Sequence, residues 1–311
     1  MKVVRGISHW DENFRNPVVA IGVFDGLHHG HRLLLQKTRE RAKIIGGTPL
    51  VMTFHPHPAK VIHPERELSL IASLEYRLRL LRNENIEACL VVNFTKRFAR
   101  ISPDHFVQHY LVQKLKAREI VVGDDFHFGH NRRGDICFLQ KCAARYGFLV
   151  HAIPVCCGVD RRKVSSSQIR KFIARGDIEH ARELLERPVT ILGRIIRGDR
   201  RGRELGYPTA NLDAMQTGFA PRGVYCVRVY LNEMSLEGMA NIGSRPSFKK
   251  EGQLGIEVHL FDFNKNIYGK EILVEFLKKI RDEKFFPSRE ALIEQLKIDE
   301  KQARQWFAGQ H

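Results

Sequence analysis

Residues 21–31 read IGVFDGLHHGH and place two histidines, His28 and His31, among three glycines and an aspartate. The stretch lies between a β-branched run and a helical pattern, so a strand should end and a helix begin here. A helix N-terminus offers free backbone N–H groups and a positive dipole end to an anion. Histidines three residues apart at such a start project to the same side and can donate to phosphate oxygens. The stretch is predicted to bind nucleotide phosphates; the alternative is a plain turn whose glycines serve geometry alone, with His28 and His29 solvated.

A second polar group, VSSSQIR at 164–170, puts three consecutive serines before an apolar helical run that contains an arginine. Serines at a helix start normally cap it by accepting backbone hydrogen bonds. The same arrangement can hold a triphosphate, with Arg170 offering a charge-assisted fork to the phosphate oxygens. Both interpretations stay open for Ser165, Ser166 and Ser167.

The third group is glycine-rich, since residues 193–212 read GRIIRGDRRGRELGYPTANL. The spacing is not that of a Walker A loop, in which a lysine directly follows the second glycine of GxxxxGK[ST]. As a bare glycine-rich loop, a surface hairpin is the favoured interpretation. Thr209 and Asn211 add a hydroxyl and an amide oxygen two residues apart, and Mg²⁺ accepts hard oxygen donors of this kind.

The elements that must position these groups change character along the chain. Up to about residue 185, apolar runs typical of strands alternate with helical patterns. The predicted strands are 18–24, 49–54, 88–94, 119–125 and 148–154, and the predicted helices are 31–45, 74–83, 103–115 and 136–147. The segment 165–185, with a helical run after its serines, closes this part of the chain. Such alternation predicts an α/β, Rossmann-like, doubly wound parallel sheet with helices on both faces. Ligands of such sheets bind at the carboxyl ends of the strands, where 21–31 lies.

After the dipeptide Arg187-Pro188 the pattern becomes strand-like and turn-rich. Runs of strands without intervening helices predict a small antiparallel β-barrel. Residues 288–309 then predict a terminal helix with a serine N-cap. We therefore expect two domains, 1–186 and 187–311.

The composition is that of an ordinary globular protein: 311 residues, 43% hydrophobic and 28% charged. No apolar run is long enough for a signal peptide or a membrane helix, so a cytoplasmic protein without a membrane partner is expected. The six cysteines show no CxxC or zinc-like spacing and are predicted to be buried free thiols. The net charge of +16 invites a nucleic-acid partner, but no zinc finger or RNP-like signature accompanies it. A basic surface around phosphate-bearing small ligands fits equally well, so nucleic acid is not the favoured partner.

Four motifs in order, GVFDGLHHGH, TFHPHP (53–58), GDDFHFGHNRRGD (123–135) and VSSSQIR, resemble the nucleotidyltransferase superfamily with the HxGH signature. The resemblance is specifically to the adenylyltransferase module of bacterial FAD synthetases. It implies transfer of AMP from ATP to FMN with release of pyrophosphate, and His28 and His31 would steady the ATP phosphates. Ser167 departs from the family pattern, in which threonine is more usual, but the hydroxyl survives. The resemblance implies nucleotide contacts from Gly22, Phe24, Asp25, Gly26, Ser165, Ser166, Ser167 and Arg170, and flavin contacts from His57, Asp125 and Phe128.

From about residue 190 to 307 the chain resembles riboflavin kinase, through PTAN, PRGVY (221–225), NIGSRPSF (241–248), EVHLFDF (257–263), YGKEILVEF (268–276) and IRDEKF (280–285). The resemblance implies a six-stranded barrel in which Thr209 and Asn211 bind Mg·ATP. Glu257 would take the proton from the ribityl 5′-hydroxyl, a step that needs a carboxylate within reach; without the flanking motif, a solvated strand glutamate would be favoured. Arg281 and the turn after it resemble a loop that closes over the flavin, with a solvated charged turn as the alternative. The loop over the ATP phosphates would contain Gly198, Gly202, Gly206 and Pro208.

Together the two modules resemble the bifunctional bacterial riboflavin kinase/FAD synthetases. That implies riboflavin, FMN, FAD and ATP as ligands and Mg²⁺ as cofactor, and leaves the oligomeric state open. The alternatives are that only one module is active, that the chain is a basic nucleic-acid-binding protein with a nucleotidyltransferase-like fold, or that it stores flavin.

Overall fold

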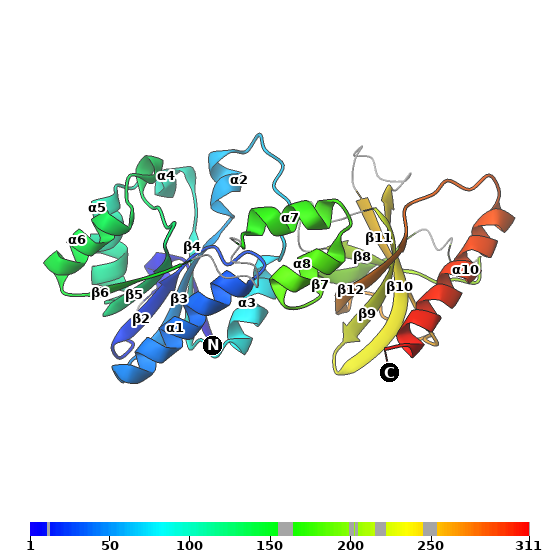
Figure 1. Cartoon of the computed structure of the whole chain (residues 1–311), viewed down its shortest axis with the longest axis horizontal. Coiled ribbons are helices and arrows are strands. Elements are labelled where there is room, and N and C mark those ends of the chain that lie inside the picture. The colour runs from blue at the N-terminus through cyan, green and yellow to red at the C-terminus, as the bar shows by residue number, and fades with distance from the viewer. Residues whose placement is uncertain are drawn as a thin grey trace. The chain divides into compact units, whose positions relative to one another are not determined.

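The computed structural model describes residues 1–10, 13–154, 164–198, 202, 205–214, 222–244 and 254–310 (Figure 1). The chain divides into two compact units. Unit 1 comprises Met1–Leu68 and Arg77–Ser165, and unit 2 comprises Ser69–Tyr76 and Ser166–His311. This division falls about twenty residues before the predicted domain boundary at 186/187, which stays a prediction.

Unit 1 is built on a six-stranded parallel sheet, as the alternating pattern predicts. Its strands are β1 (Lys2–Arg5), β2 (Pro17–Ile21), β3 (Thr48–His55), β4 (Ala88–Asn93), β5 (Glu119–Gly123) and β6 (Leu149–Ile153), in the order β1-β4-β3-β2-β5-β6. Strands β2 and β5 are buried at every residue, because both faces of the sheet are covered. Their continuous Val/Ile-rich runs are what such two-sided burial requires.

The helical segments of unit 1 connect these strands and cover the sheet. They are η1 (Ile7–His9), α1 (His29–Ile44), α2 (Pro58–Ile62), α4 (Lys96–Ala99), α5 (Pro103–His105), the π-helix η2 (Phe106–Lys114), η3 (His130–Arg132) and α6 (Ile136–Tyr146). Helix α3 (Leu74–Asn83) begins in the part of the chain that clusters with unit 2 and ends in unit 1. Helix α1, which opens with the HxGH histidines, packs on β2, β3 and β5 through Leu34, Leu35 and Ala42 (Figure 1). A short loop, residues 22–28, thus connects the carboxyl end of β2 to the start of α1.

Unit 2 contains a closed antiparallel barrel with the strand order β10-β11-β8-β7-β12-β9. Its elements are α7 (Ser166–Ala174), α8 (Ile178–Leu185), β7 (Val189–Ile196), β8 (Ala210–Ala214), β9 (Gly223–Leu231), β10 (Met234–Ser244), β11 (Leu254–Leu260), β12 (Glu271–Arg281) and α10 (Arg289–Ala308). The predicted barrel and terminal helix are both confirmed. Ser288 caps α10 by accepting from the Ala291 N–H, and Ala303 and Phe307 of this helix are buried in a cluster with barrel side chains.

The structure adds two features that the sequence analysis did not predict and corrects one expectation. Strand β1 was not predicted, although it pairs in parallel with β4. The segment 165–185 forms two helices, because Gly176 has φ +78° and Asp177 caps α8 through the His180 N–H. Cys137 is exposed, whereas Cys89, Cys142 and Cys226 are buried free thiols as expected; Cys156 and Cys157 lie outside the described residues.

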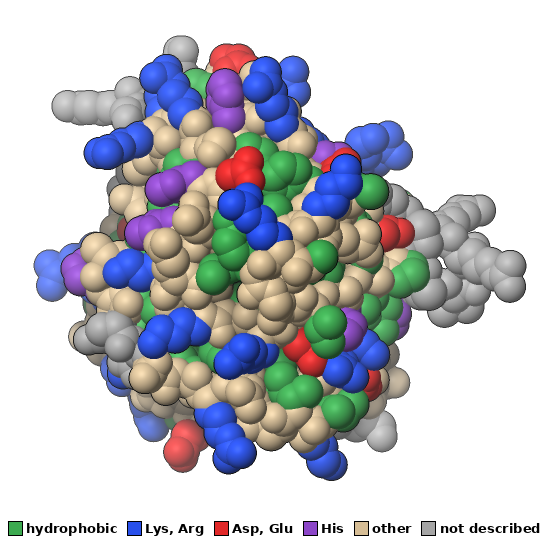
Figure 2. All heavy atoms as spheres, turned by 90° about the vertical axis from the view of Figure 1, so that its left-hand side faces the viewer, with side chains coloured by type: hydrophobic (Ala, Val, Ile, Leu, Met, Phe, Trp, Pro, Cys, Tyr) green, Lys and Arg blue, Asp and Glu red, His purple; other side chains and the backbone are tan. Residues whose placement is uncertain are grey.

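Charge and hydropathy add two observations. Lys and Arg side chains are spread over the face of unit 1 drawn in Figure 2, with Asp and Glu side chains among them. Among the described residues, no helix combines the length and the apolar character that crossing a membrane requires.

Candidate active sites

The loop between β2 and α1 has an unusual backbone. Phe24, Gly26 and Leu27 have φ values of +56°, +81° and +43°. Only glycine adopts this left-handed region freely, and a bulky residue there costs about 1–2 kcal/mol. The Phe24 ring is fully buried, so its packing fixes a backbone that the sequence would otherwise avoid. Strain of this kind at the carboxyl end of a parallel strand is typical of a ligand-binding loop.

The two HxGH histidines lie together at the start of α1. Their rings stack at 3.7 Å between centroids, and the His31 N–H donates to the His28 carbonyl at 2.9 Å. His28 is only 3% exposed, so it is not the solvated side chain that the plain-turn alternative assumes, and phosphate binding by this loop stays a prediction. The Phe24 ring packs against His31 at 5.2 Å, and the Asp25 carboxyl is buried beside the same loop. The arrangement presents two imidazoles where the helix dipole favours an anion.

Two cationic side chains near Asp25 escaped the sequence-based reasoning. Arg77 on α3 is 4% exposed and donates to the carbonyl of Val23 and, at 3.2 Å, to that of Phe54. Burial lowers the pKa of its guanidinium, and the charge of Asp25 opposes that shift. Burial likewise lowers the pKa of Lys60 on α2, again opposed by Asp25. No local pattern distinguishes these two residues from ordinary helix-surface cations, so the sequence held no signal that could have found them.

The residues predicted to bind flavin in unit 1 have differing environments. The His57 side chain caps α2 by accepting from the Ala59 N–H at 3.1 Å. Asp125 is exposed in the loop after β5. Phe128 is buried in the core of unit 1, where it packs against Phe106 with ring centroids 5.3 Å apart. Their roles toward flavin stay predictions, and for Phe128 the packing alone would account for the aromatic residue.

A cavity of about 450 Å³ opens at the carboxyl ends of β1, β3 and β4. Both polar and apolar side chains line it. It is lined by Arg5, Gly6, Ile7, Ser8, His9, His55, Val91, Val92, Asn93, Phe98 and Tyr110. None of the residues predicted above to bind nucleotide, flavin or metal lines it.

The residues predicted to bind triphosphate lie at the start of α7. Ser166 and Ser167 are its first two residues, and Arg170 is in its second turn. These three belong to unit 2, whereas Ser165 and the HxGH histidines belong to unit 1. The contribution of α7 to a nucleotide site therefore stays a prediction.

In unit 2 the predicted catalytic and metal-binding residues converge on neighbouring strands. Glu257 of β11 is the register partner of Asn211 of β8. The Thr209 hydroxyl donates to the Glu257 carboxylate at 3.5 Å, and Asn211 is 6% exposed. A hydroxyl, an amide and a carboxylate thus face one another across two antiparallel strands.

The glycine-rich segment lies against the same residues. A Cβ atom on Gly198 would lie 2.1 Å from the Nδ2 atom of Asn211, and one on Gly202 would lie 2.3 Å from the Tyr207 carbonyl oxygen. Gly206 has φ +81°, and Pro208 is exposed with its carbonyl accepting from His259 at 2.9 Å. Glycine is required at 198 and 202 by close approach, which favours the phosphate-loop interpretation over a loose hairpin.

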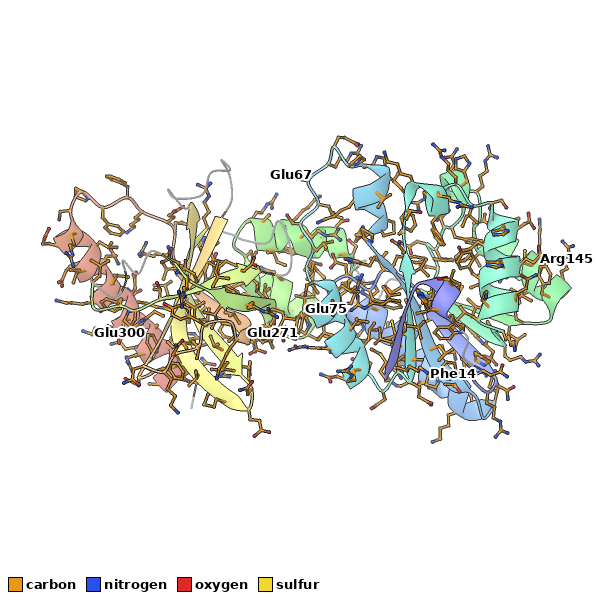
Figure 3. All side chains as sticks on the ribbon, turned by 180° about the vertical axis from the view of Figure 1, so that it is seen from behind. Phe14, Glu67, Glu75, Arg145, Glu271 and Glu300 are labelled. Carbon is orange, nitrogen blue, oxygen red and sulfur yellow. The ribbon has the colours of Figure 1, made fainter. Side chains whose placement is uncertain are left out.

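The side chain of Arg281, the last residue of β12, is bound by a carboxylate of helix α10. Its guanidinium donates to Asp299 from Nε at 2.9 Å and from Nη2 at 2.7 Å, and Gln295 donates to the same carboxylate at 2.8 Å. Asp299 is completely buried. In the same helix, Glu300, labelled in Figure 3, accepts from Nε of Arg304 at 2.8 Å. Arg281 is therefore a structural link, and its predicted flavin contact stays a prediction.

Two family models match this chain, one over its N-terminal part and one over its C-terminal part. The family model for FAD synthetase matches residues 11–168, and that for riboflavin kinase matches residues 185–307. A bifunctional riboflavin kinase/FMN adenylyltransferase of Pseudomonas fluorescens is 38% identical over 304 residues, covering 98% of this chain and 97% of that protein. The chain belongs to the bifunctional riboflavin kinase/FMN adenylyltransferase family.

Another member of this family and a solved structure match the chain over almost its full length. The bifunctional riboflavin kinase/FMN adenylyltransferase of Escherichia coli strain K12 is 37% identical and covers 99% of this chain. A crystal structure named macrolide-efflux protein, from Streptococcus pneumoniae, is 31% identical with a TM-score of 0.86, covering 98% of this chain and 100% of that one. Its name differs from those of the sequence relatives, and membership of the bifunctional family rests on the latter together with the two family models.

Proposed function

We propose that this chain is a transferase that phosphorylates riboflavin to FMN in the barrel and adenylylates FMN to FAD in the parallel-sheet unit. ATP is the co-substrate of both steps, and the domains are 1–186 and 187–311. The observation that carries the proposal is that each family match coincides with the expected fold, a parallel sheet with the His28–His31 pair and a closed barrel with Glu257 beside Thr209. The two sets of residues do not overlap, so the two steps are separable by mutation.

For the kinase step, Glu257 acts as the general base on the ribityl 5′-hydroxyl of riboflavin. A carboxylate must lie within hydrogen-bond reach of the hydroxyl whose proton it takes. The Thr209 hydroxyl, 3.5 Å from the Glu257 carboxylate, keeps this base next to the nucleotide-binding residues. The oxygen so activated attacks the γ-phosphorus of ATP, and ADP leaves. Gly198, Gly202, Gly206 and Pro208 form the loop over the phosphates.

A divalent ion, with Mg²⁺ as the expected one, suits the donor set of Thr209 and Asn211. Both offer uncharged hard oxygen atoms, and Mg²⁺ is commonly held by few protein ligands together with substrate phosphates. The described residues contain no group of three or more His, Cys, Asp or Glu side chains that could hold a metal ion. When bound, the ion would neutralise negative charge on the ATP phosphates.

For the adenylyl transfer, the FMN phosphate attacks the α-phosphorus of ATP and pyrophosphate leaves. Catalysis of this type is positioning and charge stabilisation, without a covalent enzyme intermediate. The stacked pair His28 and His31 donates to the phosphate oxygens as charge develops there. The nucleotide lies against four residues of the loop after β2, namely Gly22, Phe24, Asp25 and Gly26. Its triphosphate is held by Ser165, Ser166, Ser167 and Arg170.

Flavin recognition is assigned to His57, Asp125 and Phe128 for the FMN of the adenylylation step, and to Arg281 for riboflavin. Support differs among them. His57 caps a helix that follows the carboxyl end of β3, the edge at which parallel sheets bind ligands. Arg281 ends β12 next to the turn that resembles the flavin loop, and Asp299 fixes its guanidinium.

The test is a time course with the purified chain, riboflavin, excess ATP and Mg²⁺, in which riboflavin, FMN and FAD are separated by chromatography. We expect FMN to rise before FAD. Riboflavin that stays unchanged, together with added FMN that is not adenylylated, would contradict the proposal. In that case binding of nucleic acid that weakens steeply with salt would be the next measurement.

A further inference from the structure

A buried arginine joins the ends of two parallel strands beneath the HxGH loop. The guanidinium of Arg77 donates through Nη1 to the carbonyl of Val23 and through Nη2 to that of Phe54, 3.2 Å away. Val23 is the second residue after Ile21, where β2 ends, and Phe54 is the penultimate residue of β3. The same Val23 carbonyl also accepts from the Thr53 hydroxyl at 3.0 Å. Two side-chain donors therefore fix the carbonyl at which the loop leaves the sheet.

A charged guanidinium in this place needs a physical reason. Arginine is almost never fully buried without partners, because transfer of a charge from water is costly. A leucine or methionine at 77 would fill the same helix position at no such cost. An apolar residue lacks the planar guanidinium, whose N–H groups here donate to two carbonyls, that of Val23 just beyond β2 and that of Phe54 in β3. Buried Asp25, in the loop itself, supplies the opposite charge nearby.

The loop that starts at this point has to be held from outside. Phe24 and Leu27 both have positive φ, so local preference alone would let the backbone relax. Three residues beyond Asp25 stands His28, whose carbonyl accepts the His31 N–H. Any shift of Val23 is thus passed within a few residues to the stacked histidines.

We propose that Arg77 is a positioning residue for the adenylylation step, which fixes the 22–28 loop so that His28 and His31 meet the ATP phosphates in the productive geometry. The inference rests on the proposed adenylyltransferase function of unit 1. Arg77, on α3, would thus control the rate of adenylylation without touching a reacting atom. It would have no effect on the kinase step.

The experiment compares Arg77→Lys and Arg77→Met with Arg82→Met, which removes an exposed arginine from the same helix. In each preparation FMN adenylylation is measured for kcat and for the KM of ATP, and riboflavin phosphorylation is measured on the same molecules. Misplacing catalytic groups by about 1 Å can lower a rate about 100-fold. We expect a loss of that order in adenylylation kcat for Arg77→Met, a smaller loss for Arg77→Lys, which retains the charge but not the fork, and kinase kcat within about two-fold of wild type. Arg82→Met should leave both activities unchanged.

Amide hydrogen exchange distinguishes positioning from general destabilisation. Exchange at 24–31 should accelerate in Arg77→Lys, while β4 and β5 stay protected and the melting temperature stays near that of wild type. Adenylylation kcat within about three-fold of wild type in both Arg77 variants would overturn the proposal. So would equal acceleration of exchange throughout unit 1, since the residue would then serve the whole fold. If wild-type protein does not adenylylate FMN, the proposed function fails, whereas unchanged exchange at 24–31 in Arg77→Lys would refute the positioning role by itself.

Discussion

Replacing Gly198 with alanine should damage the kinase step selectively. The new Cβ would lie 2.1 Å from Nδ2 and 2.5 Å from Cγ of Asn211, whereas such contacts in proteins are essentially never shorter than 3.0 Å. The two groups must therefore move apart by about 1 Å, and Asn211 is buried with little room to rotate. A displacement of that size costs about 100-fold in rate, or about 2.7 kcal/mol of transition-state stabilisation.

The assay is riboflavin phosphorylation at varied Mg²⁺ and ATP, with FMN adenylylation by the same preparation as the internal reference. We expect kcat/KM for the kinase step to fall about 100-fold, with a weaker dependence on Mg²⁺, and adenylylation to be unchanged. Gly309→Ala is the matched control, because the nearest atoms to its Cβ would be 3.7 Å away. Kinase activity of Gly198→Ala within about two-fold of wild type would refute the placement of Asn211 in the nucleotide site.

Two further predictions concern the buried ion pairs. Asp299→Ala leaves the Arg281 guanidinium without its carboxylate and should lower the free energy of unfolding of unit 2 by about 3–5 kcal/mol; a denaturant midpoint equal to that of wild type would contradict this. In unit 1, hydrogen bonds from Arg41 and also from His151 lower the pKa of the Glu119 carboxyl. The ionised carboxylate therefore stabilises the folded state above pH 4.5, the ordinary pKa of the group, and this stabilisation is lost as the pH falls below that value. Glu119→Gln should therefore unfold more easily than wild type at pH 7, with the difference shrinking in acid, and a difference that grows in acid would show the sign to be wrong.

Much of the fold is predictable from the sequence because its periodic patterns are long. The helix 74–83 is predicted with the bounds it has in the structure, and the two-sided burial of β2 is visible in its continuous apolar run. Strand β1 is not predictable in this way, since KVVR is four residues long and only Val4 is buried. Its place in the sheet is decided by pairing with β4, which is a tertiary interaction.

In the candidate sites, the residues of the motifs are predictable from the sequence, but the distant residues that contact and position them are not. The three-residue spacing predicts that His28 and His31 project to the same side, but their stacking depends on His28 as the extended N-cap residue just before the helix. The approach of Glu257 to Thr209 depends on strand register across a 48-residue separation, which no local pattern encodes. Arg77 lies 54 residues from the Val23 carbonyl that it binds, and on a helical wheel it looks like a surface cation.

The central claim is that two independent sites act in sequence on one flavin. It is tested most directly with two inactivated chains, Glu257→Gln and the double variant His28→Ala/His31→Ala, each given riboflavin, ATP and Mg²⁺ alone and then mixed. The account predicts that the first chain makes no FMN from riboflavin but adenylylates added FMN, that the second stops at FMN, and that the mixture produces FAD. Loss of both activities in either chain, or FAD formation by the double variant at the wild-type rate, would contradict it.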